Sequence, residues 1–187
     1  MVVETEKIAI PKTLAEFMIW DQPEDGFKYE WNDGELIKFN GMNRKQVYIY
    51  DALNRLFVKK GCLEIGTLVS EYDIMLTGIQ MRRADVAYLS IEQIAQTKLG
   101  IDVIPEFVIE ILSESDNVNK VEEKVAEYFK AGAGGVPLKV VWNIYFEQKV
   151  VYVYTSRKSV KICTDNDICS ASPVLEGFEI SVQELLG

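Results

Sequence analysis

The stretch PEFVIEILSESD, residues 105–116, constrains the fold more than any other part of the chain. Over 106–112, apolar residues occupy both alternating sets of positions, which is the pattern of a central strand covered on both faces. Glu110 lies in the middle of this strand, on the same face as Val108 and Leu112. An ionised carboxylate that is buried without a partner costs several kcal/mol or more, so the fold must supply a partner for Glu110.

Helical and strand-like patterns alternate along the rest of the chain, which predicts a mixed α/β fold with a central sheet flanked by helices. The pair Asp33-Gly34 is expected to turn an N-terminal hairpin within FKYEWNDGELIKF. Capping patterns begin three of the predicted helices, at Thr13, Asn119 and Ser181. Helices are expected over 13–20, 44–60, 91–98, 117–131 and in the tail 181–187, and strands over 62–69, 71–77, 81–89, 106–112, 138–146, 149–156 and 159–163.

The composition of the chain fits one domain with one core. Its 187 residues are 48% hydrophobic, which leaves no spare length for a second domain, so a single domain is expected over 1–187. The formal net charge of −9 counts against nucleic-acid and membrane binding, although a locally basic groove can exist on an acidic protein. The N-terminal MVVETEKIAIPK is too polar for a secretory signal and no apolar run approaches 18 residues, so a soluble cytoplasmic protein is expected.

The chain contains no histidine, which excludes His-based triads, imidazole metal sites and most general-base chemistry at neutral pH. A metal ion would therefore be held by oxygen atoms, which favours Mg²⁺, Mn²⁺ or Ca²⁺ over zinc. The three cysteines are Cys62, Cys163 and Cys169. A bridge between the last two is one interpretation, but reduced thiols are expected for a cytosolic protein.

Two acids in strand-like segments suggest a cation site. Asp85 begins the apolar run of RRADVAYLS, and Glu110 lies in the buried strand. Near the ends of neighbouring strands, these carboxylates could hold one divalent cation, which would neutralise both and remove the penalty for their burial. The helix predicted over 117–131 carries an apolar stripe, and Lys124 falls beside Tyr128 at its edge, from which its amine can reach the sheet.

Other interpretations of these residues stay open at this point. Glu110 could form a buried ion pair with Arg82, Arg83 or Lys124 in place of a metal site. Asp85 could be a turn residue at the end of a strand. Lys124 and the lysine one turn before it could be solvated and merely balanced by the nearby glutamates.

Six segments occur in an order that is similar to a known family. They are T..EF, YEWNDGELI, R.ADVAYLS, PEFVIEILSESD, KVEEKVAEYFKAG and SPVLEGFEISVQELL. Together they resemble the PD-(D/E)XK nuclease superfamily, and more closely its Uma-two branch, which is abundant in cyanobacteria and was long described as a domain of unknown function. The resemblance covers most of the chain, and it implies a restriction-endonuclease-like mixed sheet with an N-terminal hairpin extension.

The resemblance assigns positions to the candidate residues. Asp85 matches the acid of the PD motif, with Ala84 in place of the usual proline, and Glu110 matches the acid of the (D/E)XK motif. The lysine position of that motif is filled by Leu112, which cannot act as a cation. In this branch the lysine is relocated to the following helix, and Lys124 matches that place.

The resemblance also implies two further contributors. Glu30, in KYEWNDGEL, matches an acid typical of the branch and is expected to reach the same site. The backbone carbonyl of Ile111 is expected to be an additional metal ligand. Two features depart from the family pattern: Gln46 stands where many relatives have histidine, and AGAGGVPLKVVWNIYF is longer and less regular than usual, so the outer wall of the site is expected to differ.

These residues imply a metal-dependent endonuclease that hydrolyses phosphodiester bonds of DNA. Asp85, Glu110 and Ile111 would bind one or two Mg²⁺ ions, with Mn²⁺ as an alternative. Lys124 would orient the attacking water or stabilise the charge of the transition state, with Glu30 as a further catalytic residue.

The family also implies a homodimer, for which the apolar hairpin 138–155 offers a surface. Two alternatives to the endonuclease stay open. One is a nuclease-fold binding protein that has lost the chemistry, which the lack of a clear basic groove supports. The other is a Mg²⁺-dependent enzyme acting on a small phosphate substrate, which would better explain the acidic charge.

Overall fold

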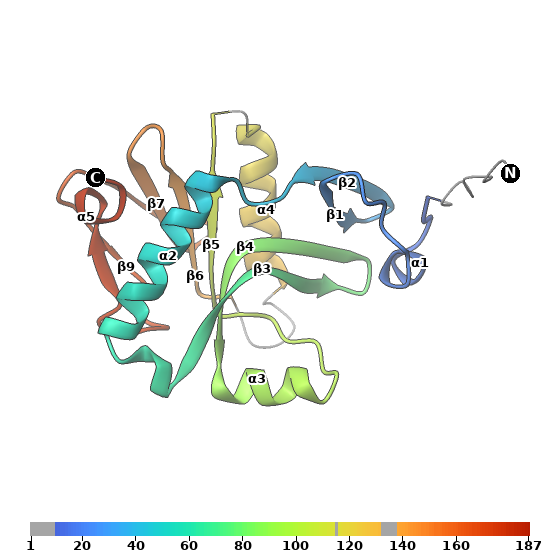
Figure 1. Ribbon diagram of the computed structural model, residues 1–187, viewed down its shortest axis with the longest axis horizontal. Helices are drawn as coiled ribbons and strands as arrows, with labels where there is room; N and C mark the ends of the chain where they lie inside the picture. Colours follow the sequence, from blue (N-terminus) through green and yellow to red (C-terminus); the bar gives the residue numbers. More distant parts are fainter. Residues whose placement is uncertain (1–9, 115, 132–137) are drawn as a thin grey trace, which may run out of the picture.

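A mixed eight-stranded sheet forms the centre of the molecule, which the computed structural model describes over residues 10–114, 116–131 and 138–187 (Figure 1). The strands lie in the order β2-β1-β4-β5-β6-β7-β8, and β3 pairs with β4 beside this path. Within the described ranges, β5 and β6 are parallel, whereas the other neighbours in this sheet are antiparallel. The strands of the sheet are β1 (Phe27–Asn32), β2 (Glu35–Asn40), β3 (Gly66–Thr77), β4 (Gln80–Ser90), β5 (Phe107–Leu112), β6 (Val140–Tyr145), β7 (Val150–Ser156) and β8 (Ser159–Thr164), and a separate two-stranded sheet joins β9 (Ile168–Ser170) and β10 (Glu179–Ser181).

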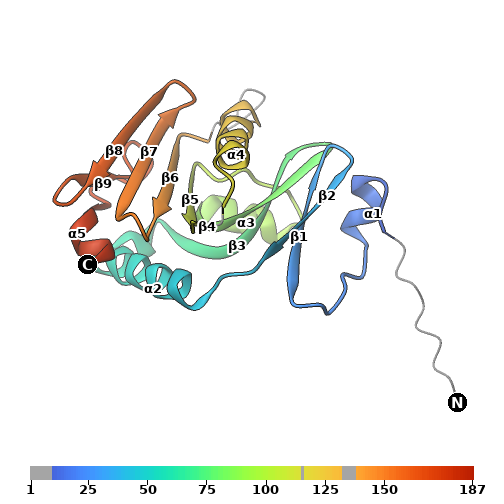
Figure 2. The ribbon, with the colours of Figure 1, turned by 90° about the horizontal axis from the view of Figure 1, so that it is seen from above.

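Helices cover both faces of the sheet, and Figure 2 shows α2 and α4 on opposite sides of it. On one face, α2 packs through an apolar stripe that includes Ile49, Leu53 and Phe57. On the other face, α4 packs through Val125 and Tyr128. Because both faces are covered, β5 is buried along its whole length, as its apolar pattern predicts. The helices are α1 (Leu14–Met18), α2 (Arg44–Lys59), α3 (Ile91–Lys98), α4 (Val118–Ala131) and α5 (Val182–Leu186), with a 3-10 turn η1 (Cys62–Glu64) after α2.

The N-terminal hairpin of β1 and β2 turns at Asp33 and Gly34, whose φ angles of 45° and 91° place both residues in the left-handed region. This backbone conformation suits a two-residue hairpin turn, so the predicted hairpin is confirmed. Trp31 of β1 pairs with Met81 of β4, and both join Phe17 of α1 in a small separate core. The hairpin therefore extends the central sheet.

One edge of β4 has a gap in its backbone pairing. Towards the start of the strand, this edge pairs with β1 at Met81, and further along it pairs with β5 from Val86 onward. Between these two ladders, residues Arg82–Asp85 have no partner strand on this edge among the described strands, whereas β3 accompanies β4 on the other edge. Backbone N–H and C=O groups in this β4 gap need other hydrogen-bond partners. Side chains of the candidate site supply them.

The prediction of two strands over 62–69 and 71–77 is wrong. The region begins with the 3-10 turn, Cys62–Glu64, and a single strand, β3, runs through the rest of it. Glu71 lies within β3 with a φ angle of 50°, a left-handed conformation that breaks the regular pairing for one residue. Glu71, at the predicted boundary between two strands, is therefore an irregularity inside one strand.

Side-chain caps begin several helices. Thr13 and Ser181 each accept the backbone N–H of the residue three positions further on, as their patterns predict. At α4 the predicted cap, Asn119, is wrong, because Asn117 accepts the backbone N–H of Asn119. The capping residue lies two positions earlier because the helix already begins at Val118.

The three cysteines are buried and free, in agreement with the expectation of reduced thiols. In the part of the chain that the structure describes, no helix is both long and apolar enough to cross a membrane. The glycine-rich passage that is expected to depart from the family pattern includes residues 132–137, which lie outside the described residues.

Candidate active site

Glu110 on β5 has only 5% of its surface exposed, and both of its carboxylate oxygens accept hydrogen bonds from α4. Tyr128 donates its hydroxyl hydrogen to Oε1 at 2.5 Å, and Lys124 donates from Nζ to Oε2 at 3.1 Å. The two donors are four residues apart and therefore lie one above the other on the same face of α4. Lys124 thus reaches the sheet as the sequence predicts, and it is the ion-pair partner that the burial of Glu110 requires.

The amine of Lys124 has as many acceptors as it has hydrogens. In addition to Glu110, it contacts Oε1 of Glu30 at 3.1 Å and donates to the backbone oxygen of Arg83, in the β4 gap, at 2.7 Å. Burial acts to lower the pKa of Lys124, but Glu110 and Glu30 outweigh it and the pKa is raised. The lysine is therefore charged, and it connects α4 to β1, β4 and β5.

Asp85 lies in the β4 gap and faces Glu110. The last pair between β4 and β5 joins Val86 to Ile109, and the same register, continued by one residue, sets Asp85 opposite Glu110. Oδ2 of Asp85 accepts the backbone N–H of Ile111 at 2.6 Å. Burial, followed by the charge of Glu110, raises the pKa of Asp85 to about 7. Burial and the charge of Glu110 thus both favour the protonated form of Asp85.

Glu30 of β1 reaches the same lysine from the other side of the β4 gap. Its Oε1 accepts the backbone N–H of Arg83 at 2.8 Å, and its Oε2 lies 3.2 Å from Nη1 of Arg82. Arg82 also pairs with Glu127 of α4 at 2.7 Å. Burial acts to raise the pKa of Glu30, but Lys124 and these two arginines outweigh it and the pKa is lowered. Glu30 is therefore ionised and contributes to the site through Lys124.

Gln46 of α2 contacts the carbonyl that is expected to bind metal. Its Nε2 donates to the backbone oxygen of Ile111 at 2.5 Å, and its Oε1 accepts the backbone N–H of Asn43 in the capping box of α2. A carbonyl oxygen has two lone pairs, so the oxygen of Ile111 retains one for a further ligand. Gln46 thus holds this carbonyl in place.

The oxygen donors around Asp85 fit a hard divalent cation. The carboxylates of Asp85 and Glu110 and the carbonyl of Ile111 are the ligand types that Mg²⁺ and Mn²⁺ prefer. Oδ1 of Asp85 accepts no hydrogen bond from the described residues, and the charge of Glu110 acts on the Asp85 carboxyl group. Within the described ranges, no three or more His, Cys, Asp and Glu side chains are grouped so that they could hold a metal ion. A cation here would therefore need the carbonyl, water or substrate to complete its coordination.

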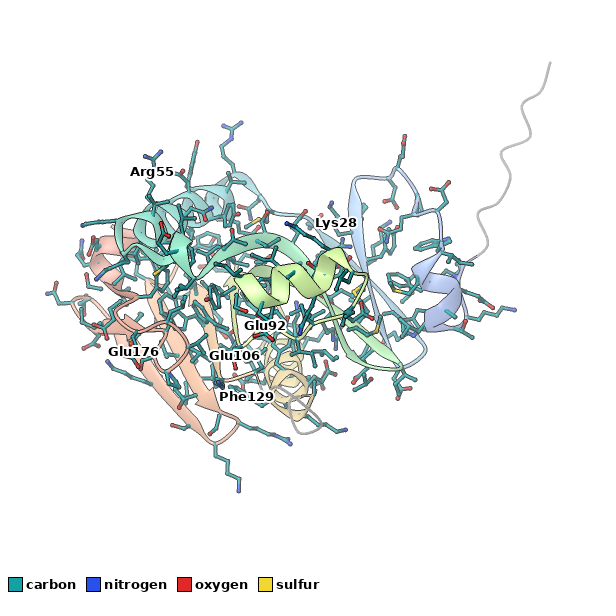
Figure 3. The ribbon with its side chains drawn as sticks, turned by 90° about the horizontal axis from the view of Figure 1, so that it is seen from below. Lys28, Arg55, Glu92, Glu106, Phe129 and Glu176 are labelled. Carbon is teal, nitrogen blue, oxygen red and sulfur yellow. The ribbon has the colours of Figure 1, made fainter. Side chains whose placement is uncertain are left out.

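A groove of about 520 Å³ lies among β1, β3 and the start of α2. Lys28, labelled in Figure 3, lies two residues before Glu30 and so on the same face of β1. It pairs with Glu71 of β3 at 3.3 Å. The groove therefore lies near Glu30, and none of its lining residues belongs to the candidate site itself. Its lining residues are Gly26, Lys28, Asn40, Gly41, Met42, Val47, Ser70 and Glu71.

A second hollow, of about 410 Å³, lies beside α3 and away from these residues. Its lining includes Glu92 and Glu106, which Figure 3 labels, together with Asp102. It contains three carboxylates and neither lysine nor arginine. This hollow therefore does not suit a phosphate group, and the groove beside Glu30 is the better candidate for a substrate.

The sequence pattern counts Tyr128 only as part of an apolar stripe, although its hydroxyl bonds to Glu110. A tyrosine at a fully buried helix position requires a partner for its hydroxyl, and this signal could have identified it. The two arginines that were considered as partners of Glu110 pair with other acids: Arg82 with Glu30 and Glu127, and Arg83 with Asp73.

The protein has the fold of the restriction-endonuclease-like nuclease class. Its mixed sheet carries two acids on adjacent strands, and the following helix supplies a lysine. The chain belongs to the Uma2 family, whose model, described as "Putative restriction endonuclease", matches residues 14–183. A solved structure of "a putative nuclease belonging to DUF820" from Anabaena variabilis ATCC 29413 is similar, with a TM-score of 0.78 and 19% sequence identity. The similarity covers 94% of this chain and 98% of that chain, and it concerns the fold. A comparison with curated proteins found no match.

Proposed function

We propose that this protein hydrolyses phosphodiester bonds of DNA with a divalent cation, Mg²⁺ or Mn²⁺. One observation carries the proposal: Asp85 and Glu110 face each other on adjacent strands, and Lys124 binds the Glu110 carboxylate. Membership of a family described as a restriction endonuclease supports the same reaction class.

In this proposal, Asp85, Glu110 and the carbonyl oxygen of Ile111 hold the cation. When bound, such a cation polarises the scissile phosphate and lowers the pKa of a water molecule. Lys124 fixes the Glu110 carboxylate and places a positive charge beside the reacting phosphate, where it favours developing negative charge. Glu30 accepts a hydrogen bond from Lys124 and so holds the amine in its position.

The groove beside the site supplies a path for the DNA backbone. Lys28 lies in its lining, and Arg44 and Lys45 are exposed in the first turn of α2, close to the lining residue Met42. Helix N-termini favour phosphate groups, and these cations add to that effect. Because the net charge of the whole chain is −9, we expect DNA binding to be weak and to fall steeply with salt.

A plasmid-nicking assay tests the proposal. The wild-type protein should nick supercoiled plasmid with Mg²⁺ or Mn²⁺ and not with EDTA. Asp85→Asn, Glu110→Gln and Lys124→Met should lose this activity. Lys120→Met, an exposed change one turn earlier on the same helix, should retain it. Absence of nicking by the wild-type protein with either ion, on single-stranded or duplex DNA, would contradict the proposal.

A nuclease-fold binding protein without catalysis is the second candidate, and the contacts of Lys124 favour it. All three hydrogens of the amine have protein acceptors, so none is available to a water or a phosphate in this arrangement. Tight binding of DNA without cleavage in the presence of Mn²⁺ would support this candidate.

The acidity of the chain favours a third candidate, a Mg²⁺-dependent enzyme that acts on a small phosphate compound. The groove of about 520 Å³ falls within the size range of small-ligand sites, which is roughly 300–1,000 Å³. Release of phosphate from nucleotides, with no nicking of plasmid, would identify this activity.

We also infer a homodimer, which would bring two sites to the two strands of a duplex. The apolar residues of the β6–β7 hairpin do not provide the expected surface, because Val141, Trp142 and Val151 are buried in the core. Exposed apolar side chains lie instead on β8, the last strand of the sheet, at Val160 and Ile162. Sedimentation at micromolar concentration should show a dimer that Ile162→Lys dissociates. A monomeric wild-type protein would contradict this inference.

A further inference from the structure

Asn143 is, like Glu110, a polar residue inside a buried strand. It lies in β6, within the apolar run VVWNIY, and 0% of its surface is exposed. Neither its Nδ2 nor its Oδ1 has a hydrogen-bond partner among the described residues. Buried polar groups are almost always hydrogen-bonded, because an unpaired amide loses its hydration without compensation. The amide of Asn143 therefore needs a polar partner that the described residues do not supply.

Asn143 is a direct neighbour of the candidate active site. β5 and β6 pair in parallel, and Asn143 stands opposite Glu110 in their register. Two residues earlier on each strand, Val141 and Val108 pack in the core beneath α4. Because side chains two residues apart share a face, the side chains of Asn143 and Glu110 both lie on the face of the sheet that α4 covers. Asp85, Glu110 and Asn143 therefore form a row across three adjacent strands.

Tyr145 provides a third polar group on the same face. It lies two residues after Asn143 on β6 and is half-buried. Burial raises the pKa of Tyr145, whereas hydrogen bonding with the Asn143 amide acts to lower it, so the two side chains are near each other. The polar atoms of Asn143 nevertheless do not reach the geometry of an ordinary hydrogen bond. A small polar molecule between the two would be in contact with both.

A water molecule fits these partners. A buried water makes about three hydrogen bonds, and Glu110, Asn143 and Tyr145 together offer that number. An ionised carboxylate has about four acceptor positions, and Tyr128 and Lys124 occupy two of those on Glu110. Glu110 can therefore accept a further hydrogen while it also binds a cation.

We propose that Asn143 and Glu110 hold one ordered water molecule beneath α4, with Tyr145 on its outer side, and that Asn143 acts through this water as a positioning residue for the Glu110 carboxylate. The amide contacts the water, and the water donates a hydrogen to Glu110. Loss of such an outer partner of a metal ligand weakens metal binding by roughly 10- to 100-fold. The water site depends only on the geometry, whereas the effect on a cation rests on the proposed function.

The first test uses the metal-free protein in EDTA. A crystal structure of the wild-type protein should show a water within hydrogen-bond distance of both the Asn143 side chain and the Glu110 carboxylate. Asn143→Leu keeps the shape of the side chain and removes its polar atoms, so it should lower the melting temperature by several degrees. Asn143→Ser, which leaves a hydroxyl and room for the water, should lower it less. Asn119→Leu, the same change at an exposed position on α4, is the matched control and should have little effect.

The second test measures Mn²⁺ affinity by calorimetry or by the electron paramagnetic resonance of free Mn²⁺, without DNA. Asn143→Leu should raise the dissociation constant roughly tenfold or more, whereas Asn143→Ser should restore most of the affinity. A purely structural role would lower the melting temperature and leave the Mn²⁺ affinity unchanged, which would overturn the positioning role. An Asn143→Leu variant that is more stable than the wild-type protein would overturn the water site as well.

The two tests separate this inference from the proposed function. If the wild-type protein binds no Mn²⁺, the metal-dependent activity and the positioning role both fail, but the metal-free crystal structure still decides the water site. If Asn143→Leu does not fold, the wild-type crystal structure and Asn143→Ser decide it. A wild-type structure without a water between Asn143 and Glu110 overturns the inference whatever the nuclease assay shows.

Discussion

The amine of Lys124 lies 3.1 Å from the carboxylate of Glu110, and this ion pair joins α4 to a strand that is buried along its whole length. The same amine lies 3.1 Å from Glu30, so one cation is shared by two buried acids. Each acid also keeps a donor of its own, Tyr128 for Glu110 and Arg82 for Glu30. Removal of the lysine and removal of one acid are therefore expected to have unequal effects.

Lys124→Met should destabilise the protein more than Glu110→Gln. The first change leaves Glu110 and Glu30 buried without their shared cation, for which a loss of about 3–5 kcal/mol is expected. The second leaves Lys124 paired with Glu30, so its cost should stay below about 2 kcal/mol. Urea unfolding in EDTA measures both values. Lys120→Met, on the exposed side of α4, should change the free energy of unfolding by less than about 0.5 kcal/mol. An equal or larger loss for Glu110→Gln would show that Lys124 does not hold the two acids as a unit.

Tyr128→Phe should destabilise the protein by about 1–3 kcal/mol, because it removes the 2.5 Å hydrogen bond to the buried carboxylate of Glu110. Tyr154→Phe is a matched control, since Tyr154 donates to Glu122 at 2.6 Å but Glu122 is exposed and can bind water instead. Its cost should be clearly smaller. Thermal unfolding of the two variants in one buffer makes the comparison, and similar losses would mean that burial of the acceptor does not matter here.

The stability of the metal-free protein should fall as the pH rises from about 4 to about 7, through the titration of Asp85. Its pKa is raised from an ordinary value of 3.8 to about 7 in the folded protein. Over this range the unfolded chain has lost the proton and the folded protein still binds it, so a rise in pH favours unfolding, and above about pH 7 the effect is complete.

Asp85→Asn removes this titration. In EDTA the variant should be more stable than the wild-type protein by about 1–3 kcal/mol at pH 8, and the difference should shrink towards pH 4. Urea unfolding at several pH values measures it. Addition of Mn²⁺ at pH 8 should stabilise only the wild-type protein, because the variant lacks a metal ligand. A difference that does not vary with pH would show that Asp85 does not titrate in this range.

The local patterns of the sequence were sufficient for most of the elements. The stripe that includes Ile49, Leu53 and Phe57 gives the inward face of α2, and Asp33-Gly34 gives the hairpin turn. These signals depend on residues within one or two turns of each other, so they can be recognised without the fold. Glu71 shows the limit, because the sequence does not reveal that a charged residue in a left-handed conformation continues a strand.

The sequence by itself determined that Glu110 would be buried and would need a partner, because Glu110 lies within a strand whose apolar residues on both faces require burial. It also placed Lys124 at the edge of the helix face that meets the sheet. Only the tertiary structure decided which groups meet there, because Glu30, Arg83 and Lys124 come together across the β4 gap from three distant segments. Partners that are set by strand order and helix packing leave no local periodicity in a sequence.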